Sequence, residues 1–156
     1  MSRYIRPRIG GAPIFFTVAL ADRSSDLLVT EVDKLRDTVR RTRAERLFDI
    51  LAWVVLPDHM HCIWQLPAGD SAYSVRWSVI KARFSLSVDA GPRRPSHLRR
   101  RERGIWQRRF WEHHLRDEAD LAAHMRYCWM NPVKHGFVTA PEEWPHSSYL
   151  RDTAVP

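Results

Sequence analysis

The sequence predicts an α+β domain in which helices pack on a mostly antiparallel sheet. The first observation behind this prediction is the order of the periodic segments, which reads strand, helix, strand, strand, helix, strand, helix. The second is that only the turn signal Pro57-Asp58 separates the two middle strands, 48–56 and 59–66. Strands joined so closely pair antiparallel, which excludes a doubly wound parallel fold. A length of 156 residues allows a single domain, 1–156, with one core.

The N-terminal half is predicted to form one strand and one helix before the hairpin. Residues 14–20 are rich in β-branched and aromatic side chains and read as the first strand. Ser24, Ser25 and Asp26 are suited to cap a following helix. That helix is indicated by apolar residues at helical spacing, namely Leu28, Val32, Leu35 and Val39.

The C-terminal half is predicted to add a helix, a strand and a final helix. The helix over 74–88 has one apolar stripe, and an arginine-rich loop over 90–103 follows it. Residues 105–115 are expected to form the fourth strand. The last helix, 117–131, carries acids in its first turn. Because Pro132 follows directly, we expect that helix to end near Asn131, with Gly136 in the turn beyond.

The charge balance points to an anionic partner. Lys plus Arg number 25 and Asp plus Glu number 18, which gives a formal charge of +7 and favours nucleic acid. No apolar stretch approaches the roughly 20 residues that a membrane-spanning helix needs, so no membrane partner is expected. No secretory signal is visible at the N-terminus, which predicts a cytoplasmic protein. Its two cysteines, Cys62 and Cys128, are then expected to be reduced and to serve in packing.

The pair His59 and His61 is a candidate metal site. Residues i and i+2 of a strand point to the same face, so both imidazoles would project together and could share one divalent ion. The alternative interpretation is two partly exposed polar residues at the start of a strand.

A second candidate pair is Tyr127 and Asn131, which share a helix face at i and i+4. A phenolate is an oxygen nucleophile that can form a covalent phosphoester, and an amide carbonyl suits magnesium or manganese. The simpler alternatives are a tyrosine at the edge of the core and an asparagine that caps the helix end. Asp120 and His124 extend the same face.

Several segments, taken together and in order, resemble the REP-associated tyrosine transposases, a group within the single-tyrosine HUH transposases. The matching segments span nearly the whole chain. They are FFTVALADR (15–23), WVVLPDHMHCIWQ (53–65), WSVIKARF (77–84), IWQRRFWEHHLRD (105–117), YCWMNPVKHGFV (127–138) and WPHSSY (144–149).

The resemblance implies a ferredoxin-like α+β sandwich and a metal-dependent nuclease and strand transferase for single-stranded DNA. In this family the histidine pair binds a divalent metal, so His59 and His61 would be ligands for Mg²⁺ or Mn²⁺, and Asn131 would complete the site. Tyr127 would be the nucleophile that forms a 5′-phosphotyrosine intermediate. The implied substrate is a hairpin from a repetitive extragenic palindrome, and the implied location is the cytoplasm, in association with the nucleoid.

Basic residues inside the family-like segments are expected to contact the DNA backbone. They are Lys81, Arg83, Arg108, Arg109 and Arg116, and the arginines of 93–103 would form a basic arm. Trp106 and Trp111 could stack on bases, although a place in the core is the simpler expectation. His124 could relay the proton of Tyr127, although a solvated surface histidine is the simpler explanation.

Two other functions are compatible with these residues. One is a domesticated module that binds hairpin DNA without cutting it. The other is a metallonuclease in which water is the nucleophile, so that Tyr127 would be dispensable. The sequence leaves open whether the protein is a monomer or a homodimer.

Overall fold

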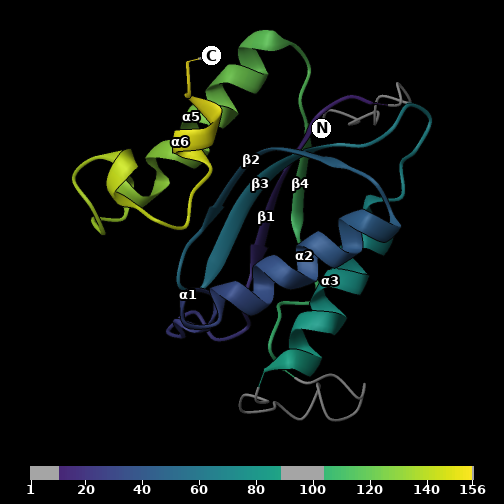
Figure 1. The fold of residues 1–156 in the computed structure, drawn as a ribbon, viewed down its shortest axis with the longest axis vertical. Helices are drawn as coiled ribbons and strands as arrows, with labels where there is room; N and C mark the ends of the chain where they lie inside the picture. The colour runs from purple at the N-terminus through teal and green to yellow at the C-terminus, as the bar shows by residue number, and fades with distance from the viewer. Residues whose placement is uncertain (1–10, 89–103, 156) are drawn as a thin grey trace, which may run out of the picture.

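The computed structural model describes residues 11–88 and 104–155, and its centre is a four-stranded antiparallel sheet (Figure 1). Its strands are β1 (Ile14–Ala19), β2 (Asp49–Val55), β3 (His59–Gln65) and β4 (Trp111–His114). They lie in the order β2-β3-β1-β4, and each neighbouring pair runs antiparallel. The predicted sheet and its hairpin are therefore confirmed.

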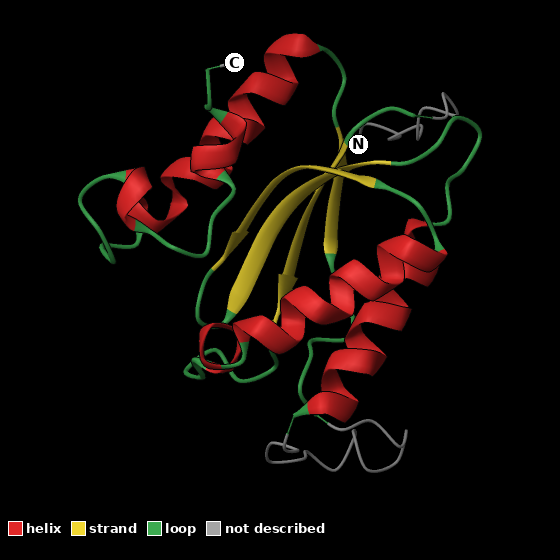
Figure 2. Cartoon of the chain, in the orientation of Figure 1, coloured by secondary structure: helices red, strands yellow, loops and turns green. Residues whose placement is uncertain are grey.

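Helices cover both faces of this sheet (Figure 2). On one face lie the short α1 (Leu27–Thr30), α2 (Val32–Glu45) and α3 (Tyr73–Ser87). On the other face lies α5 (Glu118–Lys134). A 3-10 turn η1 (Pro141–Glu143) and the short α6 (Tyr149–Asp152) follow α5 along the chain. Among the described residues, no helix combines the length and apolarity needed to cross a bilayer.

Alternation along β1 divides the core into two parts. Phe16 and Val18 point toward α2 and α3, where Trp64 and Trp77 stack with their ring centroids 4.2 Å apart. Phe15 belongs to the smaller cluster under α5. This period-2 pattern means that every second residue of the central strands faces α5.

Helix α5 is longer than predicted. It passes through Pro132 and ends at Lys134, so the expectation that it ends near Asn131 was wrong. Proline removes one backbone donor but leaves the later bonds intact, and His135 N–H donates to Asn131 O at 3.0 Å. The helix closes at Gly136, whose φ of +77° is the left-handed conformation that favours glycine. Bonds from Gly136 N–H and Phe137 N–H back to the last turn complete a Schellman motif.

Two other elements are shorter than predicted. The first helix is divided at Glu31 into α1 and α2, and α1 is held to the β2–β3 turn by a bond from Leu28 N–H to Pro57 O. The fourth strand pairs over only Trp111–His114. Upstream of it, Trp106 makes an isolated bridge to Leu20, and its indole N–H donates to Lys81 O on α3.

The segment after η1 covers the outer edge of β2. Val55 N–H donates to His146 O and Ser148 N–H donates to Trp53 O, both at 2.8 Å. The indole of Trp144 adds a bond to Val55 O at 2.9 Å. Backbone groups at the edge of a sheet otherwise stay open to pairing, so this segment completes the fold at that edge.

Candidate active site

The two histidines of β3 lie on the sheet face that α5 covers. His59 and His61 alternate with core residues, and their ring centroids are 5.0 Å apart at an interplanar angle of 82°. Both residues are buried. The strand therefore projects both imidazoles to one face of the sheet, as predicted.

Each imidazole is oriented through its Nδ1 atom. His59 Nδ1 donates to Asp58 Oδ1 at 2.8 Å, because a carboxylate can only accept. His61 Nδ1 lies 2.8 Å from Thr17 Oγ1, which the strand register places directly opposite on β1. When His61 Nδ1 carries the proton and donates it to Thr17, both Nε2 lone pairs are free to bind a metal. Such partners on the other nitrogen are typical of metal-binding histidines.

Burial keeps both rings neutral. It lowers the pKa of His61 to about 3, and interactions with His59, His135 and Lys134 act in the same direction. Burial also lowers the pKa of His59, although the adjacent Asp58 carboxylate acts in the opposite direction. A neutral imidazole is the form that coordinates a metal, so the pair is ready to bind an ion at neutral pH.

Lowering the pH from about 7 to about 4 is expected to destabilise the metal-free protein. In the unfolded chain the pKa of His61 has its ordinary value of 6.5, whereas in the folded protein the pKa is about 3. In this window the unfolded state binds more protons than the folded state. The free energy of unfolding is therefore highest above pH 6.5 and falls as the pH drops toward 3. Urea unfolding in EDTA measures this, and His61→Gln should flatten the acid limb. Identical acid limbs in the two proteins would contradict the assignment.

Helix α5 presents one polar stripe to the histidines. Tyr127, Asn131 and His135 follow one another at intervals of four residues. The Tyr127 ring lies 5.1 Å from that of His61, and the His135 ring lies 5.4 Å from that of His59. Since its two neighbours on the stripe contact the histidine pair, Asn131 lies between them and faces the same pair.

The side chain of Asn131 is buried at this site without a hydrogen bond to the described part of the chain. It is 1% exposed, and neither its Oδ1 nor its Nδ2 has a hydrogen-bond partner among the described residues. A buried amide without partners costs about 1–3 kcal/mol, so its presence calls for a ligand. An amide oxygen beside two free imidazole nitrogens fits a divalent cation.

Replacing this amide with an apolar side chain of similar size is expected to stabilise the metal-free fold. Asn131→Leu removes the unpartnered polar atoms and should raise the free energy of unfolding in EDTA by about 1–2 kcal/mol. We also expect Mn²⁺ to stabilise the wild type but not this variant. Denaturant unfolding with and without the ion measures both effects. Asn131→Ala, which leaves a cavity, is the control and should be less stable than the leucine variant. A leucine variant less stable than wild type in EDTA would contradict the assignment.

Tyr127 is accessible to a substrate. It is 39% exposed, and the edge of its ring packs on Phe15 with the centroids 5.8 Å apart. Lys134 Nζ lies 5.2 Å from the ring centroid, which places a positive charge beside the tyrosine. The sequence argument placed Tyr127 at the edge of the core, and the structure agrees.

Sequence reasoning missed four residues of this site. Asp58 and Thr17 orient the histidines, while Lys134 and His135 adjoin Tyr127 and His59. The helical spacing from Asn131 to His135 was a usable signal, but the early helix end predicted from Pro132 hid it. Thr17 gives no sequence signal, because its role depends on the β1–β3 register.

The five basic residues expected to contact DNA do not gather at this site. Lys81 and Arg83 belong to α3 on the opposite sheet face, where Arg83 donates to both carboxylate oxygens of Glu45 at 2.8 and 2.7 Å. Arg108 and Arg109 are exposed on the segment before β4. Arg116 lies just before α5 and its Nε is 3.5 Å from Asp120. The basic arm over 93–103 lies outside the described residues.

The aromatic and cysteine expectations had mixed outcomes. Trp106 is buried as expected, but Trp111 is 55% exposed, so the expectation that it belongs to the core was wrong. It lies on the outermost strand, where one side of its ring stays open to solvent while the other stacks on His113.

Cys62 and Cys128 are buried, and burial raises the pKa of both thiols, that of Cys128 to about 12. Both therefore serve in packing.

Comparison with known proteins identifies close relatives, although no protein-family model matches the chain. A REP-associated tyrosine transposase of Escherichia coli K12 is 44% identical over 154 residues, which cover 99% of this chain and 86% of that protein. A Haemophilus influenzae protein provisionally assigned to the same family is 41% identical over 154 residues, covering 97% of this chain and 88% of that one.

Solved structures give the same result. The structure of a REP-associated tyrosine transposase bound to a REP hairpin matches with a TM-score of 0.82 at 44% identity, covering 97% of this chain and 85% of that chain. A Deinococcus radiodurans crystal structure, at 16% identity and a TM-score of 0.51, shares the fold. The first likeness extends over nearly the whole chain in both sequence and structure.

Proposed function

This chain belongs to the family of REP-associated tyrosine transposases, and on that basis we propose that it cuts and rejoins single-stranded DNA at hairpins of the REP type. The observation that carries the proposal is the convergence of an exposed tyrosine, two neutral histidines and an unpartnered buried amide between β3 and α5. A nucleophile and a metal site placed side by side are suited to transesterification of a phosphodiester.

The metal would be held by His59 Nε2, His61 Nε2 and the Asn131 side-chain oxygen. Mg²⁺ or Mn²⁺ is the proposed ion, and an amide oxygen suits either of them. When bound, such an ion supplies Lewis-acid stabilisation of the charge that develops on a non-bridging phosphate oxygen. Asp58 and Thr17 fix the two imidazoles, so little reorganisation of the ligands is needed.

Tyr127 performs the covalent step. Its phenolic oxygen attacks the scissile phosphorus in line and loses its proton to solvent. A tyrosine–phosphorus ester forms and the bond from phosphorus to the 3′ oxygen breaks. That oxygen takes a proton from solvent and becomes a free 3′-hydroxyl. The DNA is thereby held as a 5′-phosphotyrosine, and the attack of another 3′-hydroxyl reverses the step without ATP. The Lys134 ammonium lies 5.2 Å from the centre of the tyrosine ring and is suited to attract the phosphate that Tyr127 attacks.

The substrate is proposed from the charge of the chain and from its likeness to a hairpin-bound transposase structure. The formal charge of +7 favours a polyanion, and the related transposase structure contains a REP hairpin. Trp111 has an exposed indole on the sheet face that α5 covers, where it packs on Phe15 as Tyr127 does. This indole is suited to stack on an unpaired base.

The test is a denaturing gel of the full chain with labelled single-stranded hairpins taken from palindromes that flank its own gene. In Mg²⁺ or Mn²⁺ we expect a protein–DNA adduct that survives denaturation, together with a fragment that ends in a free 3′-hydroxyl. EDTA should suppress both products. Cleaved DNA without an adduct would instead indicate water as the nucleophile, and hairpin binding without cleavage in any metal would indicate a binding module.

A further inference from the structure

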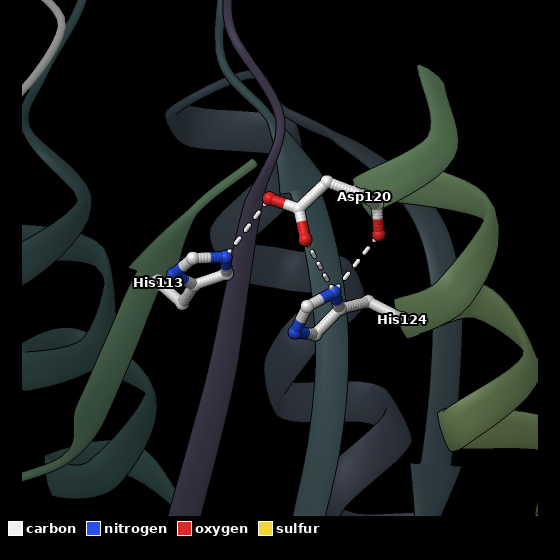
Figure 3. Close-up of side chains that lie close together, drawn as sticks. All are labelled: His113, Asp120 and His124. Atoms are coloured by element: carbon white, nitrogen blue, oxygen red, sulfur yellow. Dashed lines mark hydrogen bonds and ion pairs between the residues drawn. The ribbon is translucent and has the colours of Figure 1, made fainter. Parts of the chain in front are cut away.

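A second group of metal-binding side chains lies outside the site described above. It consists of His113 on β4 and of Asp120 and His124 on α5, and Figure 3 shows both imidazoles turned toward one carboxylate. His113 Nε2 lies 3.0 Å from Asp120 Oδ2, and His124 Nδ1 lies 3.2 Å from Asp120 Oδ1. The three side chains are about one-tenth to one-quarter exposed, so the group is partly shielded yet open to solvent on one side.

The fold brings these residues together without strain. His113 occupies the position on β4 that pairs with Phe15, so its ring points to the α5 face of the sheet. Asp120 and His124 are four residues apart on one face of α5. The two imidazoles stack with ring centroids 4.8 Å apart. The site therefore joins the outermost strand to the first turns of the helix that carries Tyr127.

The carboxylate at the centre is ionised. Burial acts to raise the pKa of Asp120, but hydrogen bonds from the Arg116 backbone and from His113 hold it below its usual value. The Arg116 N–H donates to Oδ2 at 3.0 Å and orients the carboxylate from outside the group. Such a bond to a ligating oxygen is the kind of support that metal sites use.

The spacing suits one ion. The ligand atoms all lie within 4.8 Å of one another, and ligands around a tetrahedral ion with bonds near 2.1 Å are roughly 3.4 Å apart. Two imidazoles and one carboxylate form a set of three protein ligands, and the solvent-facing side leaves a fourth position for water or for a DNA phosphate. This ligand set prefers borderline transition ions to Mg²⁺.

We propose that His113, Asp120 and His124 bind a divalent transition ion of the Zn²⁺ class, at a site separate from that of His59, His61 and Asn131. Each imidazole then carries its proton on the nitrogen that faces away from the ion. The ring of Phe15 separates the two sites, with His61 stacked on it at 5.5 Å and His124 packed against it at 4.9 Å between centroids. The ion ties β4 to α5 and adds positive charge one helical turn from Tyr127.

The alternative is a hydrogen-bond network that never binds metal. In the metal-free arrangement His124 Nδ1 also lies 2.8 Å from the Asp120 backbone oxygen, which a proton on that nitrogen explains. Metal binding has to displace this bond. The two interpretations differ in one measurable property, the affinity of the chain for Zn²⁺ or Co²⁺ when the first site is absent.

The test uses the full chain with His59→Ala and His61→Ala, which removes the first site without touching the second. Co²⁺ is titrated while its visible d–d absorption is followed, and thermal unfolding is recorded against Zn²⁺ concentration. We expect a single equivalent of bound Co²⁺ with a tetrahedral spectrum, and an unfolding midpoint that rises with Zn²⁺. Adding His113→Gln or His124→Gln should weaken the affinity at least about tenfold. His146→Gln is the matched control, because His146 lies beside β2, at the edge of the sheet opposite β4, and its loss should not change metal binding.

Two results would overturn the proposal. One is a double-alanine protein that is folded by circular dichroism yet binds neither ion. The other is unchanged binding after His113→Gln and His124→Gln, each measured singly so that a loss of folding in one does not decide the outcome. Neither readout requires cleavage of DNA, so a failure here is distinguishable from a failure of the proposed function.

Discussion

Tyr127→Phe is expected to eliminate the covalent protein–DNA adduct while hairpin binding stays within about twofold of wild type. Only the phenolic oxygen is lost, and the ring contacts with Phe15 and His61 remain. Removal of the attacking atom of an enzyme lowers its rate by about 10⁴-fold or more. Binding depends mainly on phosphate contacts, to which one hydroxyl adds little.

The measurement pairs the denaturing gel with a binding isotherm for the same labelled hairpin. Tyr149→Phe is the matched control, because it removes a hydroxyl from α6, where the ring packs on Trp129. That variant should form the adduct at the wild-type rate. Cleavage that persists in Tyr127→Phe would show that another nucleophile acts, and it would refute the assignment of Tyr127.

His59→Ala and His61→Ala are each expected to lower the metal-dependent cleavage rate by about a thousandfold. Lewis-acid stabilisation of a phosphate is worth several kcal/mol, and about 1.4 kcal/mol corresponds to each tenfold change in rate. Hairpin affinity should be nearly unchanged, because the two rings are buried and offer the backbone little charge.

Single-turnover cleavage over a range of Mn²⁺ concentrations measures this effect. His146→Ala serves as the control, since its ring packs on Trp144 and not on the histidine pair. If a folded His61→Ala protein lost binding and cleavage to the same degree, the separation between the metal site and the DNA surface would be wrong.

The elements that follow a simple period could be predicted from the sequence. The histidine pair was placed by the period of 2 of a strand, and Tyr127 and Asn131 by the period of 3.6 of a helix. The end of α5 could not be placed, because a proline inside a helix removes one bond but does not stop the helix when later turns are well bonded.

Features that depend on strand register or on the arrangement of layers stayed hidden. Thr17 supports His61 only because β1 and β3 pair in one register. Lys81 and Arg83 fall inside a family-like segment, yet that segment forms a helix on the far face of the sheet. Trp111 is exposed because β4 is the outermost strand, and nothing in the alternation of its own residues reveals that position.

The segment that covers the edge of β2 has a consequence for solubility. Trp144, His146 and Ser148 occupy backbone groups of β2 that a strand of another molecule would otherwise pair with. A chain shortened before Trp144 would present this bare edge together with the apolar side chains beneath it. Such a fragment is expected to self-associate by adding strand to strand, a route to aggregation that the complete fold closes off.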